Sequence, residues 1–440
     1  MINSKIVWQW MMTLLLATVV LGTSEAQHKI YTSLSEALRN PEKVYRLNLR
    51  QTGQTAFPAG IFKLKNLRRL DLSYNRITTI PKEIGQLNKL TRLKLDFNKI
   101  TSVPREIGQL SKLMILRLHS NKLQKLPETM GKLKKLGDID LSSNQLSSLP
   151  ASFTKLNLWS VALNDNYFTK VPPAILKMTR LRFLDLSANH IKRLPDELWN
   201  LKNLVMLNLN ALQLPATATA GNVKLKGFPA GIFKLKNLRH LGLAINQITT
   251  IPKEIAQLKT LEVLNLSFNK ITSLPEEITQ LSELVILNLF SNKLKSFPKN
   301  LVKLKNLQKL KLAYNQLESV PTVIGHLENL QDLELQVNQL SDLPASFANL
   351  NLSRLKLGHN SFSKVPSVIL TMTQLKLLDL NYNTIQKIPD EMRNLKNLRN
   401  LYLNGLKLKA VPNCVFKLSK LEHLSLDDNK IKVFPIQLTQ

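Results

Sequence analysis

Leucine and other aliphatic residues recur along most of the chain with a period of 23 residues. The first complete unit consists of Leu67, Leu70, Leu72, Asn75, Ile77, Ile80 and Pro81. The residues that lie 23 and 46 positions further along the chain are of matching types. The unit reads L-x-x-L-x-L-x-x-N-x-L-x-x-L-P-x-x-I-x-x-L and occurs about seventeen times between residues 44 and 440. Self-similarity with this period predicts a stacked array of small units rather than one compact core.

Each part of the unit predicts a local structure. The Leu-x-Leu pair predicts a short β-strand with both leucines on one side, and stacked units give a parallel sheet with about 4.8 Å between strands. The asparagine can donate to and accept from backbone groups of neighbouring units. Proline ends the returning segment, and P-x-x-I-x-x-L packs a short helical or extended segment on the opposite face. The expected fold class is therefore an α/β solenoid.

A longer repetition is superimposed on the short one. The stretch FPAGIFKLKNL occupies residues 57–67 and recurs unchanged at 228–238, an offset of 171. Further along, the offset becomes 194, one unit of 23 more, and both halves contain a shortened unit of 22 residues. We interpret these shared irregularities as a tandem duplication, with halves at 44–212 and 224–440. The small, polar residues 213–223 form an inserted loop, either a duplication scar or a hinge or contact loop.

The two ends of the chain differ from the repeats. Residues 1–26 contain one early lysine, an apolar run and small residues up to Ala26, which predicts a signal peptide; a membrane anchor is the alternative. Residues 27–43 contain Ser33-Leu34-Ser35-Glu36, a capping-box pattern that predicts a short helix covering the first unit. The last strand, around Leu424–Leu426, is expected to present an open edge that frays or self-associates.

The repeat resembles that of the leucine-rich repeat family, including the variant seen in ITTIPKEIGQL at residues 77–87. The segment SLSEALRNPEKVYRLNL (33–49) resembles the start of exported leucine-rich repeat proteins of leptospires. This resemblance implies a horseshoe whose parallel sheet lines a concave binding face. It also implies an exported binding protein, with host cell-surface or extracellular-matrix proteins as candidate partners.

The repeat register brings an apolar strip together on the expected concave face. The column before the Leu-x-Leu pair changes from arginine in the first units to apolar residues in the middle ones, with asparagines in the next column. The predicted protein-binding residues are Phe183, Met206, Asn208, His240, Val263, Asn265, Ile286, Asn288 and Phe290. An apolar centre between charged units has the composition of an interface core. Scattered exposed apolar residues also occur without any function.

The net charge is +31, from 61 Lys and Arg against 30 Asp and Glu. Much of it lies in two columns just before each strand, which include Lys65, Lys89, Lys112, Lys134, Lys135, Lys202, Lys236, Lys259 and Lys305. Stacked like charges attract polyanions such as glycosaminoglycans; alternatively, they only keep a long apolar array soluble. Sequence-specific nucleic-acid binding is not expected, because no stacking aromatics are interleaved with these lysines.

The sequence contains no constellation that predicts catalysis, a cofactor or a metal site. Cys414 is the only cysteine, which excludes an internal disulfide, and we interpret it as an unpaired turn thiol rather than a nucleophile. The histidines on the expected strands, His119, His240, His359 and His423, do not lie on neighbouring units. Gly60 lacks the strand-to-helix setting of a phosphate-binding loop. We therefore expect no enzymatic activity.

Three hypotheses for the function follow. The first is a secreted, periplasmic or surface-exposed module that binds a protein, with an adhesin-like role at the host surface. The second is a polyanion binder that uses the lysine columns. The third is a structural protein of the cell envelope that assembles through its open end.

Overall fold

The computed structural model describes residues 29–212, 225 and 227–432 of the 440-residue chain. The expected signal peptide (1–26), the inserted loop (213–223) and the residues from 433 onward lie outside the described residues. The described chain forms two compact units, divided between Leu158 and Trp159. This division falls in the shortened repeat of the first half rather than at the inserted loop.

Unit 1 contains five parallel strands, one short α-helix and a series of 3-10 helices. In chain order these are α2 (Leu34–Ala37), η2 (Pro41–Lys43), β1 (Arg46–Asn48), η3 (Ala59–Lys63), β2 (Arg69–Asp71), η4 (Lys82–Gln86), β3 (Arg92–Lys94), η5 (Arg105–Gln109), β4 (Ile115–Arg117), η6 (Glu128–Lys132), β5 (Asp138–Asp140) and η7 (Ala151–Lys155).

Unit 2 repeats the same alternation with twelve strands. In chain order its elements are β6 (Ser160–Ala162), η8 (Ile175–Lys177), β7 (Phe183–Asp185), η9 (Asp196–Asn200), β8 (Met206–Asn208), η10 (Ala230–Lys234), β9 (His240–Gly242), η11 (Lys253–Gln257), β10 (Val263–Asn265), η12 (Glu276–Gln280), β11 (Ile286–Asn288), η13 (Leu301–Lys303), β12 (Lys309–Lys311), η14 (Thr322–His326), β13 (Asp332–Glu334), η15 (Ala345–Asn349), β14 (Arg354–Lys356), η16 (Ser367–Thr371), β15 (Leu377–Asp379), η17 (Asp390–Asn394), β16 (Asn400–Tyr402), η18 (Asn413–Lys417) and β17 (His423–Ser425).

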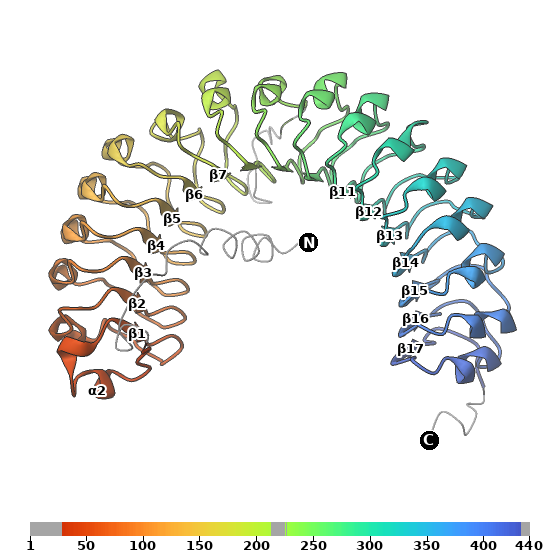
Figure 1. Cartoon of the computed structure of the whole chain (residues 1–440), viewed down its shortest axis with the longest axis horizontal. Helices are drawn as coiled ribbons and strands as arrows, with labels where there is room; N and C mark the ends of the chain where they lie inside the picture. Colours follow the sequence, from red (N-terminus) through yellow and green to blue (C-terminus); the bar gives the residue numbers. More distant parts are fainter. Residues whose placement is uncertain (1–28, 213–224, 226, 433–440) are drawn as a thin grey trace, which may run out of the picture. The chain divides into compact units, whose positions relative to one another are not determined.

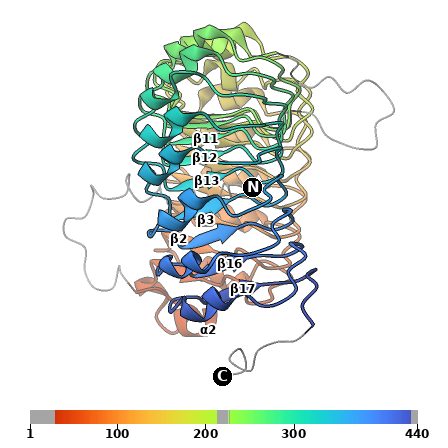
Figure 2. The same ribbon diagram turned by 90° about the vertical axis from the view of Figure 1, so that its right-hand side faces the viewer.

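Within each unit the strands line the inner, concave edge and the 3-10 helices line the outer edge (Figure 1). Neighbouring strands pair in parallel at an offset of 23 residues, as in Val263↔Ile286. The side view shows β11, β12 and β13 stacked in this way (Figure 2). The central aliphatic residue of strands β1 to β16, a leucine in most of them, points into the core, and Leu264 and Leu287 have no exposed surface. The expected α/β solenoid with a parallel sheet is thereby confirmed in both units.

Two strand pairs depart from the offset of 23. The pairing Asp332↔Arg354 has an offset of 22, and Met206↔His240 has an offset of 34. Because both pairs keep the same register of their leucines, the missing residue and the eleven extra residues (34 − 23) are absorbed outside the strands. The sheet of unit 2 therefore remains regular around the candidate site.

An asparagine ladder connects successive coils, a coil being one repeat. Asn98 donates from Nδ2 to the carbonyl oxygens of Leu72 and Leu95, each at 3.0 Å, and its Oδ1 accepts from Ile77 N–H at 3.0 Å. The Leu72 and Leu95 carbonyls also accept from Asn75 and Asn121, whereas Ile77 N–H has no other acceptor among the described residues. In the first coil, Thr52 replaces the asparagine, and its hydroxyl donates to the Leu49 carbonyl at 2.8 Å.

Proline and a left-handed residue shape the rest of each coil. Most of the 3-10 helices on the outer edge follow a proline, as η4 follows Pro81 with φ −73°. Proline suits this position because it fixes φ and needs no hydrogen-bond acceptor. The residue before most ladder asparagines has a positive φ, as at Tyr74 (59°) and Phe268 (55°). This left-handed turn redirects the chain so that the asparagine side chain points inward.

The first strand, β1, and the last strand, β17, differ in what lies beside them. At the start, Tyr31 extends the sheet beyond β1: its N–H donates to Arg46 O at 3.0 Å, and its carbonyl accepts from Asn48 N–H at 2.8 Å. Helix α2 is only four residues long, and its N-cap Ser33 accepts from Glu36 N–H at 3.5 Å. At the other end, Leu424 in β17 is half-buried, whereas the equivalent Leu401 in β16 is fully buried. Self-association through β17 remains a prediction.

Candidate functional site

The middle strands of unit 2 present an apolar column on their exposed face. Met206, His240, Val263 and Ile286 occupy the same position on β8, β9, β10 and β11, and each lies opposite the next in the strand register. All four side chains are half-buried. The strand spacing of about 4.8 Å makes the column continuous, so four predicted site residues do lie together.

Three of the predicted residues contribute little exposed surface. Phe183 is only 7% exposed and packs edge-on against Trp159, with 5.9 Å between ring centroids. Asn208 and Asn288 are also buried, and Asn208 donates from Nδ2 to Asp185 at 3.0 Å. The repeat register placed these residues on the exposed face, but Phe183 is packed against Trp159 and the two asparagines are buried. The accessible apolar column is therefore shorter than the sequence predicted.

A second apolar row lies just beyond the carboxyl ends of the same strands. Phe290 belongs to it and lies 5.0 Å from Phe268 and 4.9 Å from Tyr314, between ring centroids. Phe268 is 47% exposed and Tyr314 is 50% exposed, and Ile245 on the preceding coil is 38% exposed. Of these four residues, only Phe290 belongs to the site predicted from the sequence. The other three residues stand immediately before ladder asparagines, a column that the repeat already defines in the sequence.

Asparagine side chains lie between the column and the row. The carboxamide oxygen of Asn265 accepts from Ser267 N–H at 3.2 Å, and that of Asn288 accepts from Phe290 N–H at 3.1 Å. Within the described residues, neither Nδ2 group has an acceptor. Gly242 takes this position on β9, where a Cβ would meet the Asn208 carboxamide oxygen at 2.5 Å. Asn265 and Asn288 therefore offer hydrogen-bond donors beside the apolar groups.

His240 is the one titratable group within the apolar column. Burial lowers its pKa from the ordinary value, and the carboxylate of Glu262 opposes this with 3.7 Å between Oε2 and Nε2. The buried Nδ1 atom has no partner in the described part of the chain. Because burial has the larger effect, the imidazole is neutral at pH 7 and the column carries no net charge there.

Charged side chains border this surface on β12 to β14. Glu334 on β13 lies between Lys311 and Lys356, with Oε1 at 3.1 and 3.2 Å from their Nζ atoms. These lysines lower the pKa of Glu334 even though burial opposes the shift. The apolar surface thus ends at a network of paired charges, as at the rim of an interface.

The predicted polyanion-binding lysines are all exposed, but most also donate a hydrogen bond to a neighbouring coil. In unit 1, Lys65 donates to the Gln86 side chain at 3.0 Å and Lys89 to the Asn66 side chain at 2.7 Å. In unit 2, Lys236 and Lys259 donate to the glutamines of the next coil. These acceptors are neutral, so the positive charges remain uncompensated at short range. The exposed members of the group are Lys65, Lys89, Lys112, Lys134, Lys135, Lys202, Lys236, Lys259 and Lys305.

The described residues offer little for catalysis. Cys414 is 2% exposed, and burial raises its pKa to about 11, which makes the reactive thiolate rare at pH 7. Among the described residues, no group of three His, Cys, Asp or Glu side chains could hold a metal ion. The same residues include no helix that is long and apolar enough to cross a membrane.

One strand, one ladder rung and one outer helical turn per coil define a solenoid repeat protein. The chain belongs to the leucine-rich repeat family. A family model described as a leucine-rich repeat region matches residues 228–319, and a leucine rich repeat model matches residues 42–100, 111–161, 156–214, 305–362 and 350–408. The resemblance seen in the sequence is thereby confirmed. No protein of curated function matches the chain.

Solved structures add a bacterial and a plant comparison. The chain is 37% identical to a leucine-rich repeat protein of Leptospira interrogans, covering 92% of this chain and 95% of that one with a TM-score of 0.70. It is 27% identical to the ectodomain of GASSHO1/SCHENGEN3, a receptor kinase of Arabidopsis thaliana in complex with CASPARIAN STRIP INTEGRITY FACTOR 2 (93% and 53% covered, TM-score 0.62). It is 26% identical to the plant peptide hormone receptor RGFR1 in complex with RGF2 (93% and 74% covered, TM-score 0.60).

Proposed function

We propose that this chain is a non-enzymatic protein-binding module that holds its partner on the concave face of unit 2. The observation that carries the proposal is the pair of parallel apolar features on β8 to β12. Four half-buried side chains form the column, and four more, three of them at least 38% exposed, form the row beyond the strand ends. Exposed aromatic groups beside unpaired amide donors suit a polypeptide, which offers both apolar side chains and backbone carbonyls.

The comparisons support a protein as the class of partner. Two structures that share this fold at 26% and 27% identity are complexes with the ligands RGF2 and CASPARIAN STRIP INTEGRITY FACTOR 2. The apolar leader at residues 1–26 and the similarity to the Leptospira interrogans protein support export. We therefore place the module outside the cytoplasm, with host cell-surface or extracellular-matrix proteins as its partners.

A double substitution in the second apolar row tests this function. Purified chain lacking residues 1–26 is titrated against a panel of extracellular-matrix and cell-surface proteins, and each dissociation constant is measured. Replacing Phe268 and Tyr314 by serine removes exposed rings, so the fold should remain intact. We expect the affinity for the partner to fall by at least about tenfold, as at interface hot spots.

A control distinguishes this surface from aromatic rings in general. Tyr167 is 53% exposed and lies in unit 2 outside the row, so Tyr167→Ser should leave binding unchanged. The double variant Met206→Asp/Val263→Asp probes the column in the same assay. Partners that bind both double variants as tightly as the unsubstituted chain would refute the proposed surface.

The exposed lysines favour a second candidate function, the binding of glycosaminoglycans or other polyanions. Lys65 and Lys89 in unit 1, and Lys236 and Lys259 in unit 2, donate to amide groups and leave their charge free for an anion. Retention on heparin should fall steeply between about 0.05 and about 0.5 M NaCl, because the attraction is screened. Salt-insensitive retention, or retention unchanged in Lys65→Gln/Lys89→Gln, would eliminate this candidate.

A further inference from the structure

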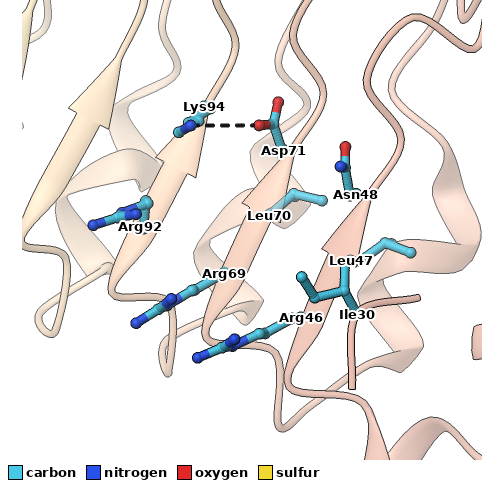
Figure 3. Close-up of a pocket in the computed structure, with 9 residues that line it drawn as sticks. All are labelled: Ile30, Arg46, Leu47, Asn48, Arg69, Leu70, Asp71, Arg92 and Lys94. Carbon is cyan, nitrogen blue, oxygen red and sulfur yellow. Dashed lines mark ion pairs between the residues drawn. The ribbon is translucent and has the colours of Figure 1, made fainter. Parts of the chain in front are cut away.

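Unit 1 has a row of three arginines on the exposed face of its first three strands. Arg46, Arg69 and Arg92 occupy the same position on β1, β2 and β3, each opposite the next in the register. Figure 3 shows their side chains extending in the same direction from successive strands. Since neighbouring strands lie about 4.8 Å apart, the three guanidinium groups share a small region.

The arginine row lines a cavity of about 140 Å³, which also borders Asp71 and Lys94 (Figure 3). Asp71 is the only acidic side chain in this lining, and it is directed at Lys94, with 3.6 Å between Oδ2 and Nζ. Within the described residues, none of the three arginines forms an ion pair. Four basic side chains and one acidic side chain leave the lining with a charge of +3 (4 − 1).

The arginine row is electrostatically unfavourable in the absence of an anion. Burial, and then the charges of Arg46 and Arg92, lower the pKa of Arg69. By contrast, Arg117 on the next strand is compensated by Asp138, which accepts at 2.7 Å between Nη1 and Oδ1. Folding does not require cations at positions 46, 69 and 92, because other coils hold apolar residues in the same column. Three arginines without an ion-pair partner among the described residues, around a cavity, are therefore best explained by a ligand.

We propose that Arg46, Arg69 and Arg92 bind a phosphate group, either as free phosphate or as a phosphate monoester. Guanidinium groups present paired N–H donors that match the oxygens of phosphate, which carries close to two negative charges at pH 7. A carboxylate would neutralise only one of the three charges and offer two oxygens. The small cavity fits one such group, and the larger part of a monoester would remain outside it.

This site is independent of the protein-binding surface, because all its residues belong to unit 1. The inference therefore goes beyond the proposed function, and either can fail without the other. The shared chemistry is the phosphate group, and separate probes distinguish its two sources.

Calorimetric titration tests the site directly. Sodium phosphate, O-phosphoserine and sodium acetate are titrated into the folded chain at pH 7 and a constant ionic strength of about 0.15 M, so that general screening is the same. We expect phosphate to bind and acetate to bind at least tenfold more weakly. Binding of phosphoserine as well identifies a monoester site, whereas phosphate alone identifies a site for the free anion.

Charge-matched variants link the binding to the arginine row. Arg69→Gln/Arg92→Gln should weaken phosphate binding at least tenfold, whereas Arg76→Gln/Arg105→Gln removes the same charge from exposed positions of unit 1 and should not. The first variant should melt no lower than the control without phosphate, because it relieves repulsion. If it does not fold, Arg92→Lys keeps the charge, loses the paired donors and should still weaken binding. Equal binding of phosphate and acetate, or equal affinity in both double variants, would overturn the proposal.

Discussion

Asp96 lies on the inner face of unit 1, two residues beyond β3, where its carboxylate is poorly solvated. Burial, and then the nearby carboxylate of Asp140, raise its pKa to about 7. The Asp96 Oδ1 atom accepts from His119 N–H at 3.0 Å, so its ionised form retains one strong partner. A carboxyl group whose pKa is higher in the folded than in the unfolded chain makes stability depend on pH.

The substitution Asp96→Asn should stabilise the protein more at high pH than at low pH. Between about pH 4 and pH 7 the folded chain binds this proton more tightly than the unfolded chain, so raising the pH lowers the free energy of unfolding. Asparagine can still accept from His119 N–H and avoids the buried charge. We expect the gain to be about 1–3 kcal/mol larger at pH 8 than at pH 4.5.

Urea unfolding at both pH values measures this difference. Asp196→Asn removes a charge at an exposed position of unit 2 and serves as the control. A gain for Asp96→Asn that is the same at pH 4.5 and pH 8 would show that the carboxyl titrates normally.

Ile245 has a backbone conformation that is unfavourable for a β-branched side chain. Its φ of 56° lies in the left-handed region, which β-branched residues rarely adopt. Asparagine tolerates this conformation, and the side chain of Ile245 is already 38% exposed. We therefore expect Ile245→Asn to raise the free energy of unfolding by about 0.5–1 kcal/mol.

Chemical denaturation of Ile245→Asn beside Ile245→Val separates backbone strain from lost packing. Valine keeps the β-branch, so it should bring no gain. If asparagine destabilises the chain, the apolar contacts of Ile245 outweigh the strain. In either case we expect binding of the protein partner to weaken, because Ile245 belongs to the second apolar row.

At the scale of the elements, the asparagine ladder is what makes one coil depend on the next. Asn98 accepts from Ile77 N–H, which has no other acceptor among the described residues, and it shares the Leu72 and Leu95 carbonyls with Asn75 and Asn121. Replacing it by leucine removes three hydrogen bonds and leaves the buried Ile77 N–H unpaired, at a cost of about 2 kcal/mol or more. We expect Asn98→Leu to lower the free energy of unfolding by at least this amount in denaturant titrations.

A graded series makes the ladder prediction specific. Threonine already replaces the asparagine at position 52, where its hydroxyl satisfies the Leu49 carbonyl, so Asn98→Thr should lose less stability than Asn98→Leu. Lys99→Leu places the same side chain at the exposed neighbouring position and should change stability by under about 0.5 kcal/mol. Equal losses for the threonine and leucine variants would mean that packing, not hydrogen bonding, determines the role of Asn98.

The elements were predictable because their determinants repeat. Strand leucines such as Leu264, the ladder asparagines and the prolines before the 3-10 helices recur at one spacing, so each coil supports the interpretation of the others. The site was less predictable, because its surface depends on side chains from neighbouring coils. Phe183 has the register of an exposed residue and is covered by Trp159. Phe268 and Tyr314 occupy a turn position, and only the stacking of coils turns them into a row.

At the scale of the whole molecule, the dominant quantity is the net charge of +31. Basic residues outnumber acidic ones by 61 to 30, so even complete pairing of every carboxylate would leave a large excess. The repeats increase the repulsion between like charges, since Lys89 and Lys112 occupy equivalent positions on successive coils. Mutual repulsion among these groups opposes the folded state, which holds them closer together than the unfolded chain does.

Salt should therefore stabilise this protein. Raising NaCl from about 0.02 M to about 0.5 M shortens the screening length from roughly 20 Å to roughly 4 Å, which suppresses repulsion between coils. We expect the melting temperature measured by circular dichroism to rise by a few degrees, corresponding to about 1–2 kcal/mol. The variant Lys89→Gln/Lys112→Gln should melt higher than the unsubstituted chain at low salt and gain less from added salt. A fall in melting temperature with salt would instead mean that ion pairs such as Arg117 with Asp138 outweigh the excess positive charge.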